Sequence, residues 1–474
     1  MVGRISQVKE MNRLLREKKS HFIAVTGRRR VGKTYLIENV YKEKICISIT
    51  GIQNGSMQEQ LTNFTYKIIE KSRIPLATFP TNWQEVFLLL KQYLQQLSTK
   101  KKQVIFIDEL PWIATPRSGF LQMLAHLWND YLSKAGNYEL VICGSASSWI
   151  RQKILNDKGG LHNRVSQVIN LLPFTLSETK AFLHSKKIKW KNAAIAEIYM
   201  AMGGIPFYLE NIKKGESPTL AIERLCFTEN GLLHGEYNNL YKALFDYPEN
   251  HEAIVKTLAN ATMGLTRSQI LTKTKIQSGG PYTRAMNDLL SSGFITEEIP
   301  FGRKKRGSIY RLSDEYSVFY HKFIVKNKKL TEGMWSQLSS SQAYKIWTGY
   351  AFESLCHKHI NALKSALKIS NIFTESSSFS YLGTKQNKGF QIDMILDRKD
   401  NIINLCECKF YSSPFIVTKA NAKILEERKQ LFNKVSKTKK TVFTTLITAN
   451  GVIKNKHFDQ VIDSHITLED LYAV

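Results

Sequence analysis

A short loop between two hydrophobic patterns constrains this chain more than any other feature. The sequence HFIAVTGRRRVGKTYLIENV has an apolar run at 22–25, then Gly27, Gly32, Lys33 and Thr34 in the spacing G-x-x-x-x-G-K-T, then an amphipathic helical pattern. A strand, a glycine-containing loop and a helix in this order predict a phosphate-binding loop. The two glycines let the backbone curl so that its N–H groups surround phosphate oxygens. The pattern predicts a nucleotide site on a parallel α/β sheet.

The residues of this loop have separate predicted tasks. Lys33 would supply positive charge to the β- and γ-phosphates of ATP, and Thr34 would supply a hydroxyl ligand to Mg²⁺. The positions between the two glycines complete the expected contacts with the nucleotide. They are Arg28, Arg29, Arg30 and Val31. ATP and Mg²⁺ are therefore the expected cofactors.

A second apolar run ends in two carboxylates. In QVIFIDELPWI, four apolar residues at 104–107 precede Asp108 and Glu109. Such a run fits a strand buried on both faces of a parallel sheet, and ligands bind at the carboxyl ends of such strands. Asp108 is predicted to hold Mg²⁺, directly or through water, and Glu109 to act as the general base on the attacking water. The alternative is that Asp108 only caps a helix at a strand–helix junction. The phosphate-binding loop upstream makes this alternative the weaker one.

A third buried strand, YELVICGSASSWI, ends at Gly144 and Ser145. A small polar side chain there can sense the γ-phosphate, so Ser145 is a predicted sensor. Arg164 stands just before another strand-like run. It is either a phosphate-sensing arginine, acting within its chain or across a homo-oligomer interface, or a surface residue. Its position alone leaves these alternatives open.

These elements, taken in order, resemble the archaeal-type AAA+ and STAND-like P-loop ATPases. VGR at 2–4 resembles their adenine-proximal box, and GGIPFYL at 203–209 resembles their Gly-Gly-x-Pro element. The resemblance covers residues 1–210 and implies a P-loop NTPase sheet with a helical lid. It also implies further residues near the nucleotide, which are Gly3 and Arg4 near the base, Ser145 as the sensor, and Pro206.

Residues 211–249 predict a helical connector, and residues 250–330 predict a separate domain. HEAIVKTLANA, LTRSQILTKTKI and YTRAMNDLLSSGFI follow helical apolar patterns, the second beginning at a Thr266 cap. FITEEIPFG, RKKRG and SIYRLSD then predict a β-hairpin. Three helices followed by a hairpin resemble winged helix-turn-helix domains.

The winged-helix resemblance implies nucleic-acid contact at the third helix and at the basic hairpin tip. Winged helices in ATPases of this kind also serve only as lids or packing modules, so both roles stay open. The residues expected to touch nucleic acid are Tyr282, Thr283, Arg284 and Asn287 on the helix, and Arg303, Lys304, Lys305 and Arg306 on the hairpin.

Residues 340–474 carry a second candidate site. QIDMILDRKDNIINLCECKFY predicts a β-hairpin with RKDN as its turn, with Asp393 on one strand and Glu407 and Lys409 on the other. Residues at i and i+2 share a strand face, so Glu407 and Lys409 can approach Asp393. The two carboxylates are hard ligands for Mg²⁺, which lowers the pKa of bound water. Lys409 would orient that water or stabilise the developing negative charge.

This arrangement resembles the PD-(D/E)xK nuclease core, with Glu353 on the preceding helix as a further ligand. The resemblance implies a C-terminal α/β restriction-endonuclease-like fold. Ile392 stands where the family's name has proline. The alternative is a decayed nuclease in which the Asp, Glu and Lys form a salt bridge. Retention of all four polar positions favours an active site.

Six cysteines are scattered along the chain, and Cys406 and Cys408 are the only close pair. On a strand they share a face, and no second Cys/His pair stands at zinc-site spacing. We expect both to be reduced and to fill apolar space on the buried face of the strand.

The formal net charge of +27 favours a polyanionic partner, with DNA first among them. Lysine is spread along the whole chain, so solubility is an alternative reason for this charge. No apolar run is long enough to span a bilayer, and the N-terminus lacks a signal-peptide pattern, so we expect a cytoplasmic protein without membrane contact. The sequence predicts an ATPase that acts on DNA, with ATP gating a nuclease domain. A STAND-like regulatory switch and a DNA-binding regulator are the alternatives.

Overall fold

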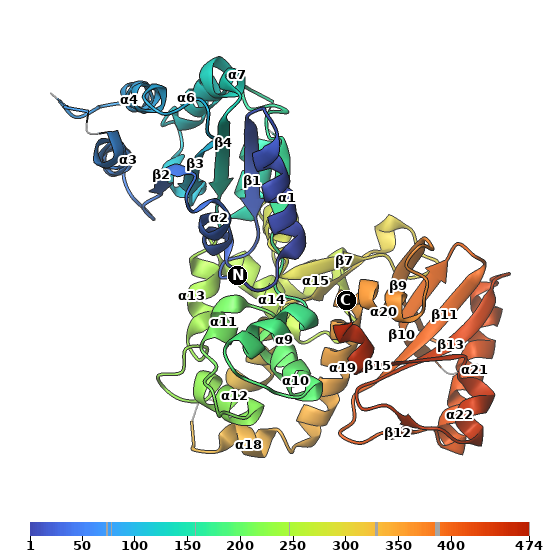
Figure 1. Ribbon diagram of the computed structural model, residues 1–474. Coiled ribbons are helices and arrows are strands. Elements are labelled where there is room, and N and C mark those ends of the chain that lie inside the picture. The colour runs from blue at the N-terminus through green and yellow to red at the C-terminus, as the bar shows by residue number, and fades with distance from the viewer. Residues whose placement is uncertain are drawn as a thin grey trace. The chain divides into compact units, whose positions relative to one another are not determined.

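The structure is a computed structural model that describes residues 1–72, 74–76, 78–156, 158–245, 247–327, 330–383 and 389–473 (Figure 1). Its contacts divide the chain into two compact units. The first unit contains residues 1–172 and two short later segments, and the second contains the remainder. No helix in the described ranges is long and apolar enough to cross a membrane.

A five-stranded parallel sheet forms the centre of the first unit. Its strands lie in the order β2-β3-β4-β1-β5, and all neighbouring pairs are parallel. β1 and β4 are buried along their whole length, as expected of strands covered on both faces. The predicted parallel α/β sheet is confirmed. Its strands are β1 (His21–Thr26), β2 (Ile45–Thr50), β3 (Gln103–Asp108), β4 (Tyr138–Cys143) and β5 (Gln167–Asn170).

Helices α3, α4 and α6 pack on one face of this sheet. Trp83 lies at the centre of the contact, with ring centroids 5.6 Å from Phe64 and 4.7 Å from Phe120, and all three meet the strand residues Phe22 and Ile105 in one core. The helices of the first unit are α1 (Ile5–Arg16), α2 (Lys33–Tyr41), α3 (Met57–Ser72), α4 (Trp83–Gln95), α5 (Leu110–Ile113), α6 (Phe120–Leu127), α7 (Ser133–Ala135) and α8 (Ser147–Ile150).

The second unit begins with a bundle of short helices. α9 starts at a capping box in which the Thr175 side chain and Glu178 satisfy each other's backbone N–H groups. Gly204 lies against Phe174, where an added Cβ would be 2.0 Å from the Phe174 carbonyl oxygen, so only glycine fits. The helices are α9 (Leu176–Ser185), α10 (Asn192–Met202), α11 (Pro206–Glu210), α12 (Pro218–Cys226) and α13 (Glu236–Lys242).

Three helices and a small antiparallel sheet follow. The sheet has the order β6-β8-β7, and Thr266 caps α15 in a capping box with Gln269, as the sequence predicted. The elements occur in the predicted sequence, and the winged-helix class itself stays a prediction. They are α14 (Glu249–Ala259), β6 (Leu265–Thr266), α15 (Arg267–Thr274), α16 (Gly280–Ser291), β7 (Ile295–Glu298) and β8 (Ile309–Leu312).

The residues of α16 that were expected to touch nucleic acid differ in exposure. Tyr282 is 0% exposed, and the guanidinium of Arg267 lies 4.8 Å from its ring centroid. Arg267 also donates a hydrogen bond of 2.9 Å to the Thr283 hydroxyl. The prediction that Tyr282 reaches nucleic-acid bases is wrong, because its ring fills the core. Arg284 and Asn287 are exposed.

A five-stranded mixed sheet forms the C-terminal part. Its order is β15-β13-β11-β10-β9, with β9, β10 and β11 antiparallel and β11, β13 and β15 parallel. The predicted hairpin is present as β10 and β11. The strands are β9 (Thr374–Tyr381), β10 (Phe390–Arg398), β11 (Ile402–Lys409), β13 (Thr441–Thr448) and β15 (Ser464–Thr467), with a separate pair β12 (Phe415–Ile416) and β14 (Val452–Ile453).

Helices α19 and α21 contact this sheet and supply its functional side chains. On α21, Phe432 joins Ile403 and Leu405 of β11 in an apolar cluster. On α19, Cys356 instead meets Cys408, which lies on the other face of β11. The remaining helices are α17 (Glu315–Phe319), α18 (Met334–Leu338), α19 (Gln342–Lys358), α20 (Ile360–Ala366), α21 (Lys419–Ser436) and α22 (Lys456–Val461).

Candidate functional site

The loop between β1 and α2 takes the shape that its glycines allow. Gly27 has φ 144°, and an added Cβ would lie 2.3 Å from the carbonyl oxygen of Leu171. Gly32 has φ 87° and precedes the first residue of α2, Lys33. The Lys33 ammonium is buried and donates to the carbonyl oxygens of Gly27, at 2.9 Å, and Arg28, at 3.1 Å. Burial lowers its pKa. The cation is therefore held inside the loop that the sequence predicted to bind phosphate.

Asp108, at the end of β3, lies beside the start of α2. The Thr34 hydroxyl donates to Asp108 Oδ2 at 2.8 Å, so the two predicted magnesium ligands adjoin. The other carboxylate oxygen, Oδ1, accepts from the Cys143 thiol at 2.7 Å and from the Glu109 N–H at 2.9 Å. Burial raises the pKa of the Cys143 thiol, so it stays a donor. One hydroxyl and one carboxylate oxygen at this spacing fit Mg²⁺.

Glu109 is held by Ser145 from the neighbouring strand end. Glu109 Oε2 accepts two hydrogen bonds of 2.9 Å, from the backbone N–H and from the hydroxyl of Ser145. The backbone of Glu109 has φ 46°, a left-handed conformation that is strained for a residue with a Cβ. The predicted sensor is therefore a direct partner of the predicted general base.

The residues before α1 contact the loop through Arg4. Its guanidinium is buried and donates to the carbonyl oxygens of Val31, at 3.1 Å, and Leu172, at 2.6 Å. Gly3 and Arg4 both have positive φ, 69° and 61°. The structure thus places Arg4 against the P-loop backbone, and a direct contact between Arg4 and the nucleotide base stays a prediction.

The other residues predicted to bind the nucleotide differ in burial and in position. Within the loop, Arg28 and Val31 are buried, and Arg29 and Arg30 are half-buried. Arg164 is exposed in the first unit, and its role stays a prediction. Pro206 is the first residue of α11 and belongs to the second unit.

In the C-terminal sheet, Asp393 lies where two strands part. The pairing of β10 with β9 shifts register between Ile392 and Ile395, and the pairing of β10 with β11 ends at Met394. Beyond that point Asp393 Oδ2 accepts from the backbone N–H of Cys408 at 2.8 Å. A bulge re-aims a side chain, and here a carboxylate takes the place of a backbone partner. The alternation of side chains between the two sheet faces, expected along β10, is therefore interrupted at Asp393.

Glu407 is bound by two cations. The Lys409 ammonium lies 2.7 Å from Oε1, and the Arg428 guanidinium of α21 lies 2.8 Å from Oε2. Burial works against the charged form of Lys409, but Glu407 and Asp393 outweigh it and raise its pKa. The predicted proximity of Glu407 and Lys409 is confirmed. The contact of Arg428 with Glu407 was not predicted from the sequence.

Glu353 and Asp393 are half-buried carboxyl groups, and the charge of Asp393 acts on Glu353. Partial burial raises the pKa of both. The charge of Glu407 raises both further, and the charge of Asp393 also raises the pKa of Glu353. A divalent cation would relieve this repulsion. Among the residues that the structure describes, no three His, Cys, Asp or Glu side chains stand as a ready metal-binding group. The donor chemistry therefore fits Mg²⁺ once Glu407 is released from one of its cationic partners.

The cysteines near this site are structural. Cys406 and Cys408 are 1% and 6% exposed, in agreement with the predicted buried face. The contact with Cys356, together with burial, raises the pKa of the Cys408 thiol, so it is a poor nucleophile.

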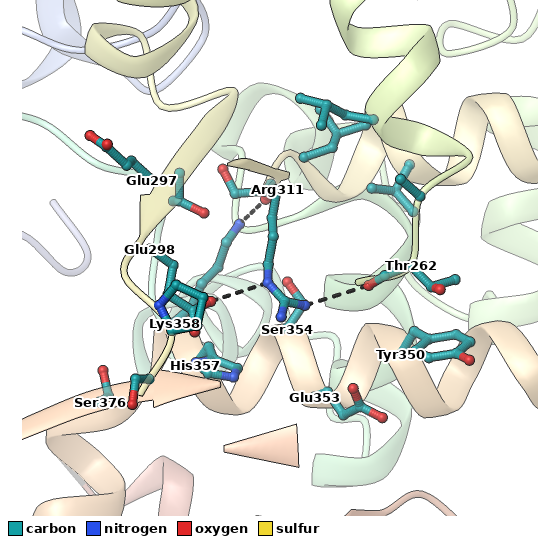
Figure 2. Close-up of a pocket in the computed structure, with 18 of the residues that line it drawn as sticks. Thr262, Glu297, Glu298, Arg311, Tyr350, Glu353, Ser354, His357, Lys358 and Ser376 are labelled. Carbon is teal, nitrogen blue, oxygen red and sulfur yellow. Dashed lines mark hydrogen bonds and ion pairs between the residues drawn. The ribbon is translucent and has the colours of Figure 1, made fainter. Parts of the chain in front are cut away.

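A cavity of about 1020 Å³ lies within the second unit, beside the β7–β8 hairpin, α19 and β9 (Figure 2). Figure 2 shows Arg311 between Glu298, at 3.1 Å, and the carbonyl oxygen of Thr262. Glu353 lines the same cavity. Carboxylates outnumber cations in its walls, so the cavity does not suit phosphate. They are Glu297, Glu298, Glu315, Glu353, Glu375 and Asp397 against Arg303, Arg311, Lys322 and Lys358.

Comparison with known proteins identifies the N-terminal part. Residues 1–212 match the family described as ATPase domain predominantly from Archaea. This region is an archaeal-type ATPase domain. The ATPase domain includes the phosphate-binding loop, Asp108, Glu109 and Ser145, and it extends beyond the first compact unit into α9, α10 and α11.

Other similarities extend past the ATPase domain. The uncharacterized protein MJECL04 of Methanocaldococcus jannaschii is 25% identical over 402 residues, which are 83% of this chain and 83% of that protein. The Walker-type ATPase of Pyrococcus abyssi has 18% identity and a TM-score of 0.50, covering 68% of this chain and 96% of its own. That likeness shows a shared fold. The ORC2 protein of Aeropyrum pernix has 14% identity and a TM-score of 0.41, covering 72% of this chain and 96% of its own.

Proposed function

We propose that this protein hydrolyses ATP with Mg²⁺ and acts on DNA, with the nucleotide state governing metal-dependent phosphodiester cleavage by the C-terminal domain. The observation that carries the cleavage part is the position of Asp393 at a parting of two strands, beside Glu407 and Lys409. Partly buried carboxyl groups with raised pKa values and a cation among them are typical of sites that handle phosphate esters with a metal.

ATP hydrolysis would use residues already in contact with one another. Thr34 and Asp108 would hold Mg²⁺, which neutralises charge on the β- and γ-phosphates. Lys33 would exchange its contacts with loop carbonyls for phosphate oxygens. Glu109 would accept the proton of the attacking water, and Ser145 keeps the Glu109 carboxylate oriented for that task.

Phosphodiester cleavage would divide its tasks among four side chains. Asp393 and Glu407 would hold Mg²⁺, with Glu353 binding the metal or a water attached to it. The metal supplies a bound water of lowered pKa. Lys409 would stabilise the negative charge that develops on the phosphate oxygens while water attacks phosphorus. The bond from phosphorus to the sugar oxygen would break, and that oxygen would take a proton from solvent water.

The ATPase domain and the C-terminal domain share contacts that support gating. His359, at the end of α19, accepts a hydrogen bond of 3.0 Å from the Leu176 N–H of α9. Tyr472 donates at 2.8 Å to the Asn192 carbonyl oxygen of α10. α9 and α10 belong to the ATPase domain by sequence, and α19 carries Glu353. If nucleotide binding rearranges α9 and α10, these contacts would therefore shift α19 and the cleavage site.

Plasmid cleavage with Mg²⁺, with and without ATP, tests the proposal. We expect Asp393→Asn to abolish cleavage and leave ATP turnover intact. Asp397→Asn is the matched control, because Asp397 lies on the same strand, pairs with Lys440 and stands outside the cluster. Lys33→Ala should remove the response to ATP. Absence of cleavage by the unaltered protein with Mg²⁺ or Mn²⁺, on both duplex and single-stranded DNA, would refute the nuclease part.

A regulatory switch is the second candidate, and one observation favours it. Lys409 and Arg428 together neutralise Glu407, which is the salt-bridged arrangement expected of a decayed nuclease. In that case ATP would still alter DNA binding or partner binding, and Asp393→Asn would change neither.

A further inference from the structure

The short strands β12 and β14 follow directly on the end of the C-terminal sheet that carries the candidate cleavage site. β11 and β13 are parallel neighbours, so their carboxyl ends lie together, and β11 ends at Lys409. The chain then runs from β11 into β12 and from β13 into β14, and these two strands pair in parallel. The Asn450 side chain donates to the Tyr411 carbonyl oxygen at 2.6 Å, and the Phe415 N–H donates to the Gly451 carbonyl oxygen at 2.9 Å. The resulting β12–β14 ribbon therefore adjoins the proposed cleavage residues along the chain.

One face of the β12–β14 ribbon is packed onto the domain. Phe415 of β12 and Val452 of β14 are half-buried and contact an apolar cluster that contains Val417, Leu446 and Phe458. Leu446 belongs to β13 and Phe458 to α22, so the cluster joins the ribbon to the sheet and to a helix. The inner face thus fixes the position of the ribbon.

The other face of the ribbon presents apolar side chains to solvent. Successive side chains of a strand point to opposite faces, and the register partners Ile416 and Ile453 are 48% and 52% exposed. The Tyr411 ring is 51% exposed, and its centroid lies 5.4 Å from that of Phe415, with the ring planes 31° apart. Because Phe415 is held by the inner cluster, it supports the Tyr411 ring while much of that ring stays open to solvent.

The Tyr411 ring also lies close to the candidate cleavage site. Its Cα atom is at most about 7 Å from that of Lys409, because two residues of chain reach no farther. Burial opposes the charged form of Lys409, whereas Glu407, Asp393 and Tyr411 raise its pKa, so the Tyr411 phenol lies within electrostatic range of the ammonium. A nucleotide whose phosphate contacted Lys409 would therefore have its base, or a neighbouring base, near the Tyr411 ring.

The surroundings of the ribbon are positively charged. Lys454 follows β14, and Lys419 and Lys456 are the first residues of α21 and α22. All three are exposed, and none of them forms an ion pair with a residue in the described ranges. A two-fold contact with a second copy of the chain would bring like charges together, because such a contact uses the same surface on both copies. A polyanion suits the outer face better.

We propose that the Tyr411 ring stacks on an unpaired base of a DNA strand whose phosphate lies at Lys409, so that the C-terminal site takes a single strand or a frayed strand end rather than an intact duplex. The bases of an intact duplex are stacked on one another, so the ring can stack only on a base that has left the helix. Aromatic stacking accepts every base, and no sequence preference follows from it. This inference rests on the proposed function, since it names the substrate form of the same site, but its binding test does not require cleavage.

Fluorescence anisotropy in EDTA, with a labelled oligothymidylate and with a labelled duplex of the same length, tests it. Tyr411→Ala and Tyr411→Leu both remove the aromatic ring, and the leucine keeps apolar bulk. We expect each to lose about tenfold in affinity for the single strand, with affinity for the duplex unchanged. Tyr411→Phe keeps the ring and should bind as the unaltered protein does. Phe373→Ala is the matched control, because Phe373 is a 62% exposed ring of the same domain with the Lys399 ammonium 5.8 Å from its centroid.

Unchanged single-strand affinity in both Tyr411→Ala and Tyr411→Leu would overturn the inference. An equal loss in Tyr411→Phe would assign binding to the hydroxyl instead, and an equal loss in Phe373→Ala or on the duplex would show an effect that is not specific to stacking. A dimer in light scattering that Ile416→Ser with Ile453→Ser converts to a monomer would assign the surface to a second copy. Because EDTA prevents cleavage, a protein that binds single strands through Tyr411 but never cuts leaves this inference standing while the nuclease proposal fails. A protein that cuts DNA but binds single strands equally well without the ring gives the opposite result.

Discussion

Ser145 donates both its backbone N–H and its hydroxyl to one carboxylate oxygen of Glu109, at 2.9 Å each. A carboxylate with two donors on one oxygen is fixed in orientation, so the other oxygen is the one available to an attacking water. Because β3 and β4 are neighbours in the sheet, their ends meet and bring these two residues together.

Ser145→Ala should lower the ATP turnover number roughly tenfold, at about 1.4 kcal/mol for the lost hydroxyl bond, with little change in nucleotide affinity. The backbone bond to Glu109 would remain, so the loss should be smaller than that of Glu109→Gln, expected at 10²- to 10⁴-fold. Steady-state turnover together with binding of a fluorescent ATP analogue would separate these effects. A Ser145→Ala protein that binds ATP poorly but turns over normally would assign Ser145 to nucleotide binding instead.

Arg428→Gln should lower the Mg²⁺ concentration that DNA cleavage requires. Arg428 and Lys409 both neutralise Glu407, so a metal has to displace one of them before it binds that carboxylate. Removing the arginine leaves the carboxylate more available, and we expect the Mg²⁺ concentration at half-maximal rate to fall several-fold. Lys429→Gln is the matched control, since Lys429 is adjacent and pairs with Asp463 instead. A higher Mg²⁺ requirement in Arg428→Gln would mean that the arginine positions Glu407 for the metal.

The sequence predicted the features that depend on local patterns. The phosphate-binding loop and the β10–β11 hairpin follow from glycine spacing, apolar runs and a turn signal, and each lies where it was expected. Tyr282 could also have been placed correctly. It stands four residues before Met286 and seven before Leu289, a helical spacing that predicts burial on one face, and both of those residues are buried.

Other features depend on contacts that no local pattern encodes. Arg428 follows Glu407 by 21 residues and reaches it only because α21 lies over that face of β11. The bulge at Asp393 contains no glycine or proline to mark it, and it changes which side chains share a face. The attachment of the β7–β8 hairpin to β9 joins residues 77 positions apart, Phe301 and Ser378, and needs the whole sheet to be in place.

His359→Gln should flatten the pH dependence of stability in the acidic range. Burial lowers the pKa of His359 from 6.5 to about 4, so the unfolded chain binds this proton more tightly. The stabilisation by neutral His359 is complete above pH 6.5 and is lost as the pH falls toward 4, by about 3 kcal/mol at most. Glutamine can still accept from the Leu176 N–H and does not titrate. Urea denaturation at pH 5 and pH 7 would measure the difference, with the exposed His184→Gln as the control.

Tyr472→Ala should weaken the response of DNA cleavage to ATP, and it should leave the cleavage rate without ATP unchanged. Tyr472 donates to the Asn192 carbonyl oxygen, and the Lys180 ammonium lies 5.4 Å from its ring centroid, so this side chain ties the end of the chain to α9 and α10. Without these contacts a nucleotide-dependent movement of α9 and α10 would reach the C-terminal domain less directly. The ratio of cleavage rates with and without ATP should approach one in Tyr472→Ala. It should be intermediate in Tyr472→Phe, which keeps the ring and loses the hydroxyl. An unchanged ratio in Tyr472→Ala would show that coupling runs through other contacts, of which His359 with Leu176 is the next to test.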